Sequence, residues 1–252
     1  MEKIIFLLIS TVFLFTSCGL GNGKNDSVDP IMRHDVVIMV DDTEGGLYQW
    51  SEILKVEDLV NLFTVEGTQH YGSVTFTDIN DVSLNSIKTI KLSEPLPYEE
   101  GSTQLLKKMK RESNHRELLN SFLKVSELHK TFIGRNTLEE KRNSILYGPI
   151  TKAINRLATS KADEKTLIIL SDMIENSECG NFYKATACNY TKIIADLILC
   201  SRVTLTPNSG VKVIVLFQTT SPEKDKEFTK SMEIWDILFK KAGITYEILP
   251  NL

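Results

Sequence analysis

The sequence predicts an α/β fold, a three-layer sandwich in which a mostly parallel, six-stranded central sheet carries helices on both faces. Two observations lead to this prediction. Apolar runs rich in β-branched residues recur at residues 36–40, 167–170 and 213–217, and such runs suit central strands that are covered on both faces. Amphipathic segments of helical length separate the runs, and strands that alternate with helices favour a parallel sheet.

The amino-terminal half predicts three strands and two helices. Residues 35–41 read as a buried strand, and residues 50–63 place apolar side chains at helical spacing. Residues 71–78 alternate between polar and apolar in the manner of a strand, and residues 86–92 give another. Residues 103–130 predict a long helix with an apolar face formed by Leu105, Leu106, Met109, Leu118, Leu119, Phe122, Leu123 and Leu128.

The carboxyl-terminal half continues the alternation of helix and strand. The predicted elements are a helix over 145–159, a strand over 166–171, a helix over 182–199, a strand over 211–217, a helix over 223–242 and a strand over 244–249. Gly243 ends the last helix, because glycine readily adopts the left-handed backbone that closes helices. The region of about 100–143 is longer than a sheet crossover requires. We interpret it as a helical insertion and a candidate surface for partner binding.

The first 17 residues have the pattern of a secretory signal. Lys3 precedes an apolar stretch over residues 4–15, which is shorter than the roughly 20 residues that a membrane span needs. The sequence Thr16-Ser17-Cys18 resembles the lipobox of bacterial lipoproteins, in which the cysteine is lipidated and becomes the mature N-terminus. The resemblance implies a protein of the bacterial cell envelope that is held to a membrane by a palmitate-bearing Cys18. The alternative is an ordinary secretory signal followed by an incidental cysteine.

The rest of the chain divides into a tether and one domain. Residues 18–31 predict a flexible tether, because their composition cannot bury a core, and residues 32–252 suit a single domain. The formal net charge of −4 gives no electrostatic footprint for nucleic acid. With Cys18 lipidated, three of the four cysteines remain, which allows one internal disulfide in an oxidising envelope. Cys179 and Cys188 flank a short loop and are the expected pair.

Two of the predicted buried strands end on a carboxylate. Asp41 follows the first run, and Asp172 follows the run at 167–170. In open α/β sheets, ligands bind beyond the carboxyl ends of the strands. Two acids delivered to one edge, with hydroxyl residues beside them, favour a hard cation such as Mg²⁺.

The order of elements, together with these aspartates, resembles a von Willebrand factor type A domain, most specifically at residues 34–45, 144–176 and 211–249. The resemblance implies a six-stranded sheet between helix layers, with a metal-ion-dependent adhesion site on its upper rim. The family motif is Asp-x-Ser-x-Ser after the first strand, a threonine from a later loop and a last aspartate.

Asp41 stands at the first aspartate of this motif, Thr43 at the first serine, and Asp172 at the last aspartate. Gly45 occupies the second serine position and removes a hydroxyl ligand. The loop hydroxyl is Ser144 or, alternatively, Thr137. The implied site is incomplete, so it either binds Mg²⁺, Ca²⁺ or Mn²⁺ weakly or holds no cation. In the second case the two aspartates would cap helices or accept hydrogen bonds from loop amides.

The expected function is that of a membrane-anchored envelope lipoprotein whose type A-like domain mediates protein–protein interaction or adhesion with an envelope protein of unknown identity. The alternative is a metal-dependent hydrolase that acts on envelope components. No Gly-x-Ser-x-Gly elbow and no Walker A loop occur in the sequence, and the four histidines lack the spacing of metal ligands. We therefore expect a protein that is not an enzyme.

Overall fold

A computed structural model describes residues 31–41, 50–63, 69–79, 87–95, 103–133 and 143–252. Six strands form one sheet, and they are β1 (Ile31–Val40), β2 (Gln69–Asp78), β3 (Lys88–Leu92), β4 (Glu164–Leu170), β5 (Lys212–Leu216) and β6 (Thr245–Leu249). The strand order is β3-β2-β1-β4-β5-β6, in which β3 runs antiparallel to β2 and every other pair is parallel. The predicted six-stranded, mostly parallel sheet is confirmed.

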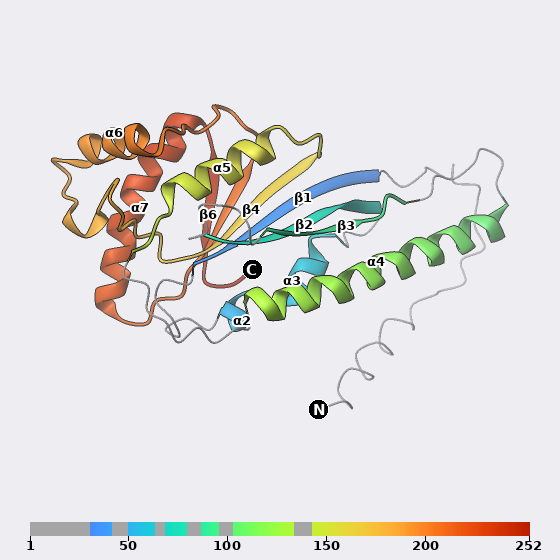
Figure 1. Ribbon diagram of the computed structural model, residues 1–252. Coiled ribbons are helices and arrows are strands. Elements are labelled where there is room, and N and C mark those ends of the chain that lie inside the picture. Colours follow the sequence, from blue (N-terminus) through green and yellow to red (C-terminus); the bar gives the residue numbers. More distant parts are fainter. Residues whose placement is uncertain (1–30, 42–49, 64–68, 80–86, 96–102, 134–142) are drawn as a thin grey trace, which may run out of the picture.

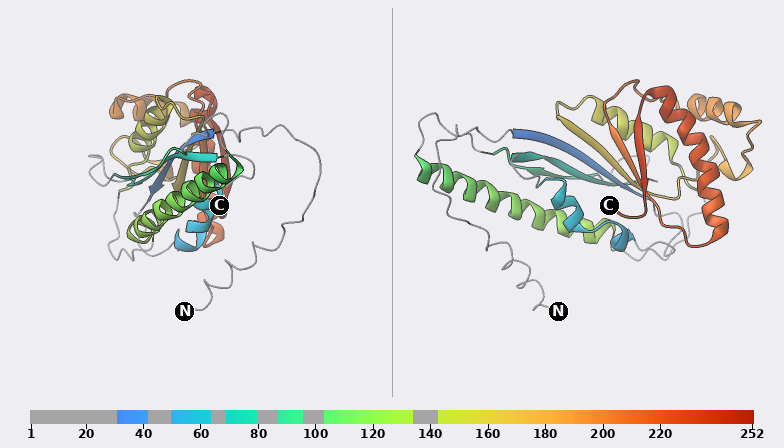
Figure 2. Two further views of the ribbon diagram at one scale, coloured as in Figure 1. Left: turned by 90° about the vertical axis from the view of Figure 1, so that its right-hand side faces the viewer. Right: turned by 180° about the vertical axis from the view of Figure 1, so that it is seen from behind.

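Helices cover the two faces of the sheet (Figure 1, Figure 2). One layer contains α2 (Trp50–Ile53), α3 (Val56–Asn61) and α4 (Gln104–Phe132), and the other contains α5 (Tyr147–Ala158), α6 (Tyr190–Ser201) and α7 (Pro222–Ala242). The central strand β1 packs against both helix layers, because its side chains point alternately to the two faces of the sheet. Val36 and Ile38 belong to the apolar cluster under α2 to α4, whereas Val37 and Met39 belong to the cluster under α5 to α7.

A glycine allows β2 to lie close against β1. Gly72 is paired with His34 in the parallel ladder and has a φ of 138°, a conformation that residues with a side chain rarely adopt. A Cβ atom at this position would lie 1.8 Å from the carbonyl oxygen of His34. Any other residue at position 72 would therefore push the two strands apart.

Two predicted helices have different boundaries in the structure. The predicted helix over 50–63 is divided into α2 and α3, because the Asp58 side chain accepts a hydrogen bond from the Lys55 backbone N–H (2.9 Å) and starts a new helix there. The predicted helix over 182–199 begins only at Tyr190. Before it, the Asn189 side chain accepts a hydrogen bond from the Thr186 N–H (2.7 Å), and such local side-chain bonds compete with helical ones. Gly243 ends α7 with a left-handed φ of 65°, as predicted.

The long helix α4 is part of the core and not only an insertion. Phe122, Val125 and Phe132 in its carboxyl-terminal half are buried against the sheet. Its amino-terminal half extends past the ends of the strands (Figure 1), so Leu105, Leu106 and Met109 are exposed. Leu119 and Leu123 are exposed as well, because they lie on the side of the helix that faces away from the sheet. Within the described ranges, no helix combines the length and apolar character needed to cross a bilayer.

The disulfide joins Cys179 to Cys200, with a distance of 5.4 Å between their Cα atoms. The expected pairing of Cys179 with Cys188 is therefore wrong, and Cys188 is an exposed free thiol. The reason is the path of α6, whose last turns fold back on the loop that carries Cys179. Leu197 of α6 packs so closely on Gly180 that a Cβ at position 180 would lie 2.8 Å from its side chain.

Candidate functional site

The candidate site lies at the carboxyl ends of β1 and β4. The strand order runs outward from β1 through β2 to β3, and in the opposite direction from β4 to β6. The junction between β1 and β4 is thus a topological switch point, the place where open α/β sheets bind ligands. Asp41 follows β1 directly, and Ser171 and Asp172 follow β4. The Asp41 N–H donates to the Leu170 carbonyl (2.9 Å), so the two strands stay paired up to this edge.

The Asp41 carboxylate joins three segments of the chain. Its Oδ2 atom accepts hydrogen bonds from the Ser171 hydroxyl (2.7 Å) and from the Ser144 hydroxyl (3.3 Å). All three side chains are buried. The backbone carbonyl of Asp41 also accepts a hydrogen bond from the Trp50 indole (3.2 Å), which ties the site to α2. The structure thus brings Asp41 and Ser144 together, as the sequence predicted.

Asp172 lies beside this group but makes a local contact. Its Oδ1 atom accepts a hydrogen bond from the Ile174 N–H (3.0 Å), which is the turn that aspartate typically forms with its own backbone. This contact with a loop amide is the one expected of Asp172 if the site holds no cation. The other positions named from the family motif, Thr43, Gly45 and Thr137, lie outside the described residues.

The turn after Asp172 has an unusual backbone. Met173 is buried and has a left-handed φ of 60°, a conformation that costs a residue with a side chain roughly 1–2 kcal/mol. Two side chains of α7 bind its carbonyl oxygen: the Trp235 indole donates at 2.9 Å, and the Ser231 hydroxyl donates as well. These buried hydrogen bonds offset the backbone cost and fix the loop that carries Asp172.

Glu175 holds the beginning of α5 at the same rim. It is 1% exposed, and its Oε2 atom accepts hydrogen bonds from the N–H groups of Leu146 and Tyr147, both at 2.7 Å. Leu146 provides no side-chain cap of its own, so a distant carboxylate satisfies N–H groups that a helix start leaves unpaired. Burial raises the pKa of Glu175, and the charge of Asp41 raises it further, while hydrogen bonds from Ser177, Tyr147 and Leu146 act in the opposite direction.

A short backbone bridge fixes the position of Ser144. Its N–H donates to the Asn176 carbonyl (3.0 Å), and the Asn176 N–H donates back to the Ser144 carbonyl (2.8 Å). The loop before α5 is therefore clamped to the loop after β4 by both backbone and side-chain contacts. The Ser144 hydroxyl reaches Asp41 from this fixed backbone.

The chemistry of these side chains fits a weak site for a hard cation. Asp41, Asp172, Ser144 and Ser171 offer oxygen atoms only, which Mg²⁺ and Ca²⁺ prefer. A hydroxyl that donates its proton to Asp41 retains lone pairs for a cation, so the observed hydrogen bonds are compatible with binding. In the part of the chain that the structure describes, no three Asp, Glu, His or Cys side chains converge. A bound cation would therefore depend on two carboxylates, hydroxyls and water.

Two residues of the rim were not predicted as members of the site. Ser171 supplies the shorter of the two hydrogen bonds to Asp41, and Glu175 anchors α5. The signal that could have indicated them is the sequence Ser171-Asp172-Met173-Ile174-Glu175, which places polar side chains directly after a buried strand, at the edge of the sheet.

No family model and no curated protein matches this chain. What the protein does is therefore inferred from its own residues. The most informative of them are the buried, hydrogen-bonded oxygens at the switch point.

Proposed function

We propose that this protein is a lipid-anchored component of the bacterial cell envelope whose domain binds another envelope protein through the rim formed by Asp41, Ser144, Ser171 and Asp172. A weakly held divalent cation, Mg²⁺ or alternatively Ca²⁺ or Mn²⁺, would complete the contact. The observation that carries the proposal is the Asp41 carboxylate at the switch point, which accepts hydrogen bonds from Ser144 and Ser171.

The chemistry of an incomplete cation site suits partner binding. Magnesium requires six oxygen ligands and keeps several waters, so two carboxylates and hydroxyls would leave positions open. A carboxylate from a partner protein can displace one of these waters and bind the cation directly. The resemblance to von Willebrand factor type A domains supports this mechanism, because that family places its adhesion site at the same edge of the sheet.

Hydrogen bonds hold the loops of the rim in fixed positions. Glu175 and the Ser144–Asn176 bridge fix one side, and the contacts of Met173 with α7 fix the other. A preorganised site loses less conformational entropy when a partner binds. Together these features favour a recognition surface over a mobile loop.

The cation is tested by titrating the protein with MgCl₂, CaCl₂ and MnCl₂ in a calorimeter and by thermal unfolding. A cation present at ten times its dissociation constant stabilises the fold by about 1.4 kcal/mol, which corresponds to a rise in melting temperature of roughly 3–6 °C for a domain of this size. Asp41→Asn should abolish both the heat of binding and the rise. Asp196→Asn, on the exposed surface of α6, is the matched control and should leave both unchanged.

The absence of binding at 10 mM of each salt would contradict the cation site, as would binding that survives Asp41→Asn.

The partner is sought in a second experiment, by capture from an extract of the envelope with and without a chelator. We expect a stoichiometric partner that is retained by the wild type and lost from Asp41→Asn. Turnover of an envelope component that depends on Asp41 or Asp172 would instead support the alternative, a metal-dependent hydrolase.

The anchor is tested independently of the rim. Cys18 lies outside the described residues, so the proposal depends on the sequence Thr16-Ser17-Cys18 alone. Cys18→Ser should move the protein from the membrane fraction to the soluble envelope fraction and abolish labelling with palmitate. Labelling that persists in this variant would contradict the anchor.

A further inference from the structure

A groove runs along the edge of α5 over β1 and β2, away from the rim. It consists of two adjoining hollows with volumes of about 310 Å³ and 150 Å³. Val37, Thr75 and Arg156 line both hollows, so the two are parts of one groove. Together they reach the size of pockets that bind small molecules, which begins at about 300 Å³.

The arrangement of the helices leaves room for this groove. α5 packs on β1 and β4, whereas the helix that packs on β2 and β3 is α4, on the opposite face (Figure 1). On the α5 side, no described helix covers the neighbouring side chains of β2. The residues Ser73 and Thr75 of β2 lie there beside Asp35 and Val37 of β1, their partners in the parallel ladder.

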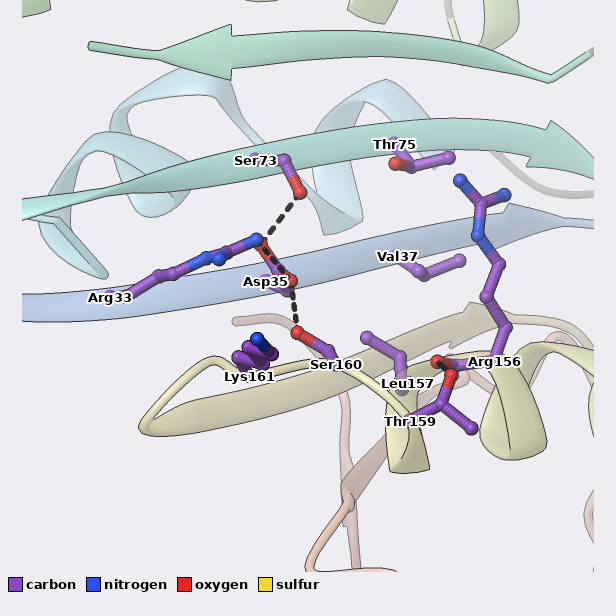
Figure 3. Close-up of a pocket in the computed structure, with 10 residues that line it drawn as sticks. All are labelled: Arg33, Asp35, Val37, Ser73, Thr75, Arg156, Leu157, Thr159, Ser160 and Lys161. Carbon is purple, nitrogen blue, oxygen red and sulfur yellow. Dashed lines mark hydrogen bonds and ion pairs between the residues drawn. The ribbon is translucent and has the colours of Figure 1, made fainter. Parts of the chain in front are cut away.

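One end of the groove is cationic. Arg33, Arg156 and Lys161 line it, together with one acid, Asp35. The Asp35 carboxylate is already neutralised by its neighbours. It forms an ion pair with Arg33 (3.3 Å) and accepts hydrogen bonds from the hydroxyls of Ser73 (2.8 Å) and Ser160 (Figure 3).

The remaining two cations have no such partner. Neither Arg156 nor Lys161 forms an ion pair or a side-chain hydrogen bond with another residue that the structure describes. In Figure 3 the Arg156 side chain extends past Val37 toward Thr75, so its exposed guanidinium lies at the opening of the groove. A guanidinium in this position can bind an oxyanion through two parallel hydrogen bonds.

The other end of the groove is mainly apolar. Its apolar lining consists of Val37, Ile87, Pro149 and Ala153, and the fully buried Met39 of β1 lies beneath them. Thr77 and Lys152 are the further polar side chains of this end besides the shared Thr75 and Arg156. The groove thus changes along its length from cations and hydroxyls to aliphatic side chains.

We propose that this groove binds a small organic anion with an aliphatic tail. The head, a carboxylate or a phosphate, is bound by Arg156, and the tail lies on Ile87 and Ala153 beside Val37. A guanidinium without an ion-pair partner selects a negative head, and Lys161 adds positive charge at the far side of the same hollow. The aliphatic end contributes through removal of apolar surface from water. The site is separate from the rim, so this proposal does not depend on the proposed function.

The test uses the full-length protein and a series of carboxylates, butyrate, hexanoate and octanoate, in calorimetric titrations. Affinity should rise by up to about fourfold for each added methylene, the factor that corresponds to about 0.8 kcal/mol. Octyl phosphate should bind as well, and the comparison with octanoate identifies the preferred head. Octylammonium, with the same tail and the opposite charge, should bind at least tenfold more weakly.

Two variants separate the head from the tail. Arg156→Gln should weaken octanoate at least tenfold, whereas Arg116→Gln, an exposed arginine on α4, should have no effect. Ala153→Leu fills the apolar end and should weaken octanoate more than butyrate. Melting temperatures within 2 °C of the wild type would show that the variants are folded.

Several results would overturn the proposal. One is the absence of binding of both octanoate and octyl phosphate at 10 mM to the folded protein. Another is equal affinity for octylammonium, or affinity that Arg156→Gln does not change. If inorganic phosphate binds as tightly as octyl phosphate, the aliphatic end does not contribute, and the proposed class of ligand is wrong.

Discussion

Replacing Glu175 with alanine tests the architecture of the rim most directly. This buried carboxylate accepts hydrogen bonds from the N–H groups of Leu146 and Tyr147, each at 2.7 Å. The substitution leaves both donors without an acceptor at a helix start. A buried donor that loses its partner costs about 1–3 kcal/mol, so the loss of two such bonds should lower the free energy of unfolding of Glu175→Ala by about 2–6 kcal/mol. This is a large part of the 5–15 kcal/mol typical of a domain.

The measurement is urea unfolding at pH 7.5, followed by circular dichroism. Glu178→Ala is the matched control, because Glu178 is exposed in the same loop, and a change there should stay within about 0.5 kcal/mol. Glu175→Gln preserves the shape and one acceptor oxygen, so it should cost less than the alanine variant. A loss below about 1 kcal/mol for Glu175→Ala would mean that the carboxylate does not hold the helix.

The same residue predicts a dependence on pH. Burial raises the pKa of Glu175 above its ordinary value of 4.5, so the folded protein takes up this proton at a higher pH than the unfolded chain does. Its contribution to stability therefore increases as the pH falls from the raised pKa toward 4.5. Glu175→Gln lacks this contribution, so the advantage of the wild type over this variant should grow across that interval. A difference that stays constant with pH would refute the assignment.

Three further predictions concern the core, the disulfide and His34. Ile169→Ala should lower the free energy of unfolding by roughly 2–4 kcal/mol, because the side chain is fully buried in β4. Reduction or removal of the Cys179–Cys200 bond, which spans 21 residues, should cost about 3 kcal/mol by loop entropy, and these two cysteines should be found in one peptide pair by non-reducing mass mapping. Burial and the neighbouring His70 lower the pKa of His34 below 6.5, so the free energy of unfolding should fall as the pH drops below about 6.5. In denaturant titrations, the free energy of unfolding of His34→Gln should decrease less over the same pH range.

The elements that could be predicted are those in which a single segment determines its own structure. The run Val36 to Val40 is apolar throughout because both of its faces are covered, and it forms the central strand as predicted. Gly243 ends α7 because the left-handed turn requires it. In α4, by contrast, the apolar residues Leu105 and Leu123 are exposed. Helical spacing alone indicates neither how far the sheet extends beneath Leu105 nor that only part of the broad apolar face around Leu123 is buried.

The features that escaped prediction depend on segments that meet only after folding. Cys200 reaches Cys179 because α6 folds back on the loop after β4, and short sequence spacing favoured Cys188 instead. Glu175 caps a helix whose first residues lie almost 30 positions earlier in the chain. The cationic end of the groove is formed by residues from β1 and from the end of α5, and no local pattern links them.

The position of β1 in the sheet has a consequence for the order of folding. It is the first of the described strands in the sequence, yet it pairs with β2 on one edge and with β4 on the other. Its pairing with β2 joins residues that are 38 positions apart, as in His34 with Gly72, whereas its pairing with β4 joins residues that are 130 positions apart, as in His34 with Glu164. Until β4 joins the sheet, one edge of β1 has unpaired backbone groups, and such edges can pair with other chains. Because its central contacts are distant in sequence, we expect the domain to fold slowly and to depend on dilution or a chaperone until β4 has joined the sheet.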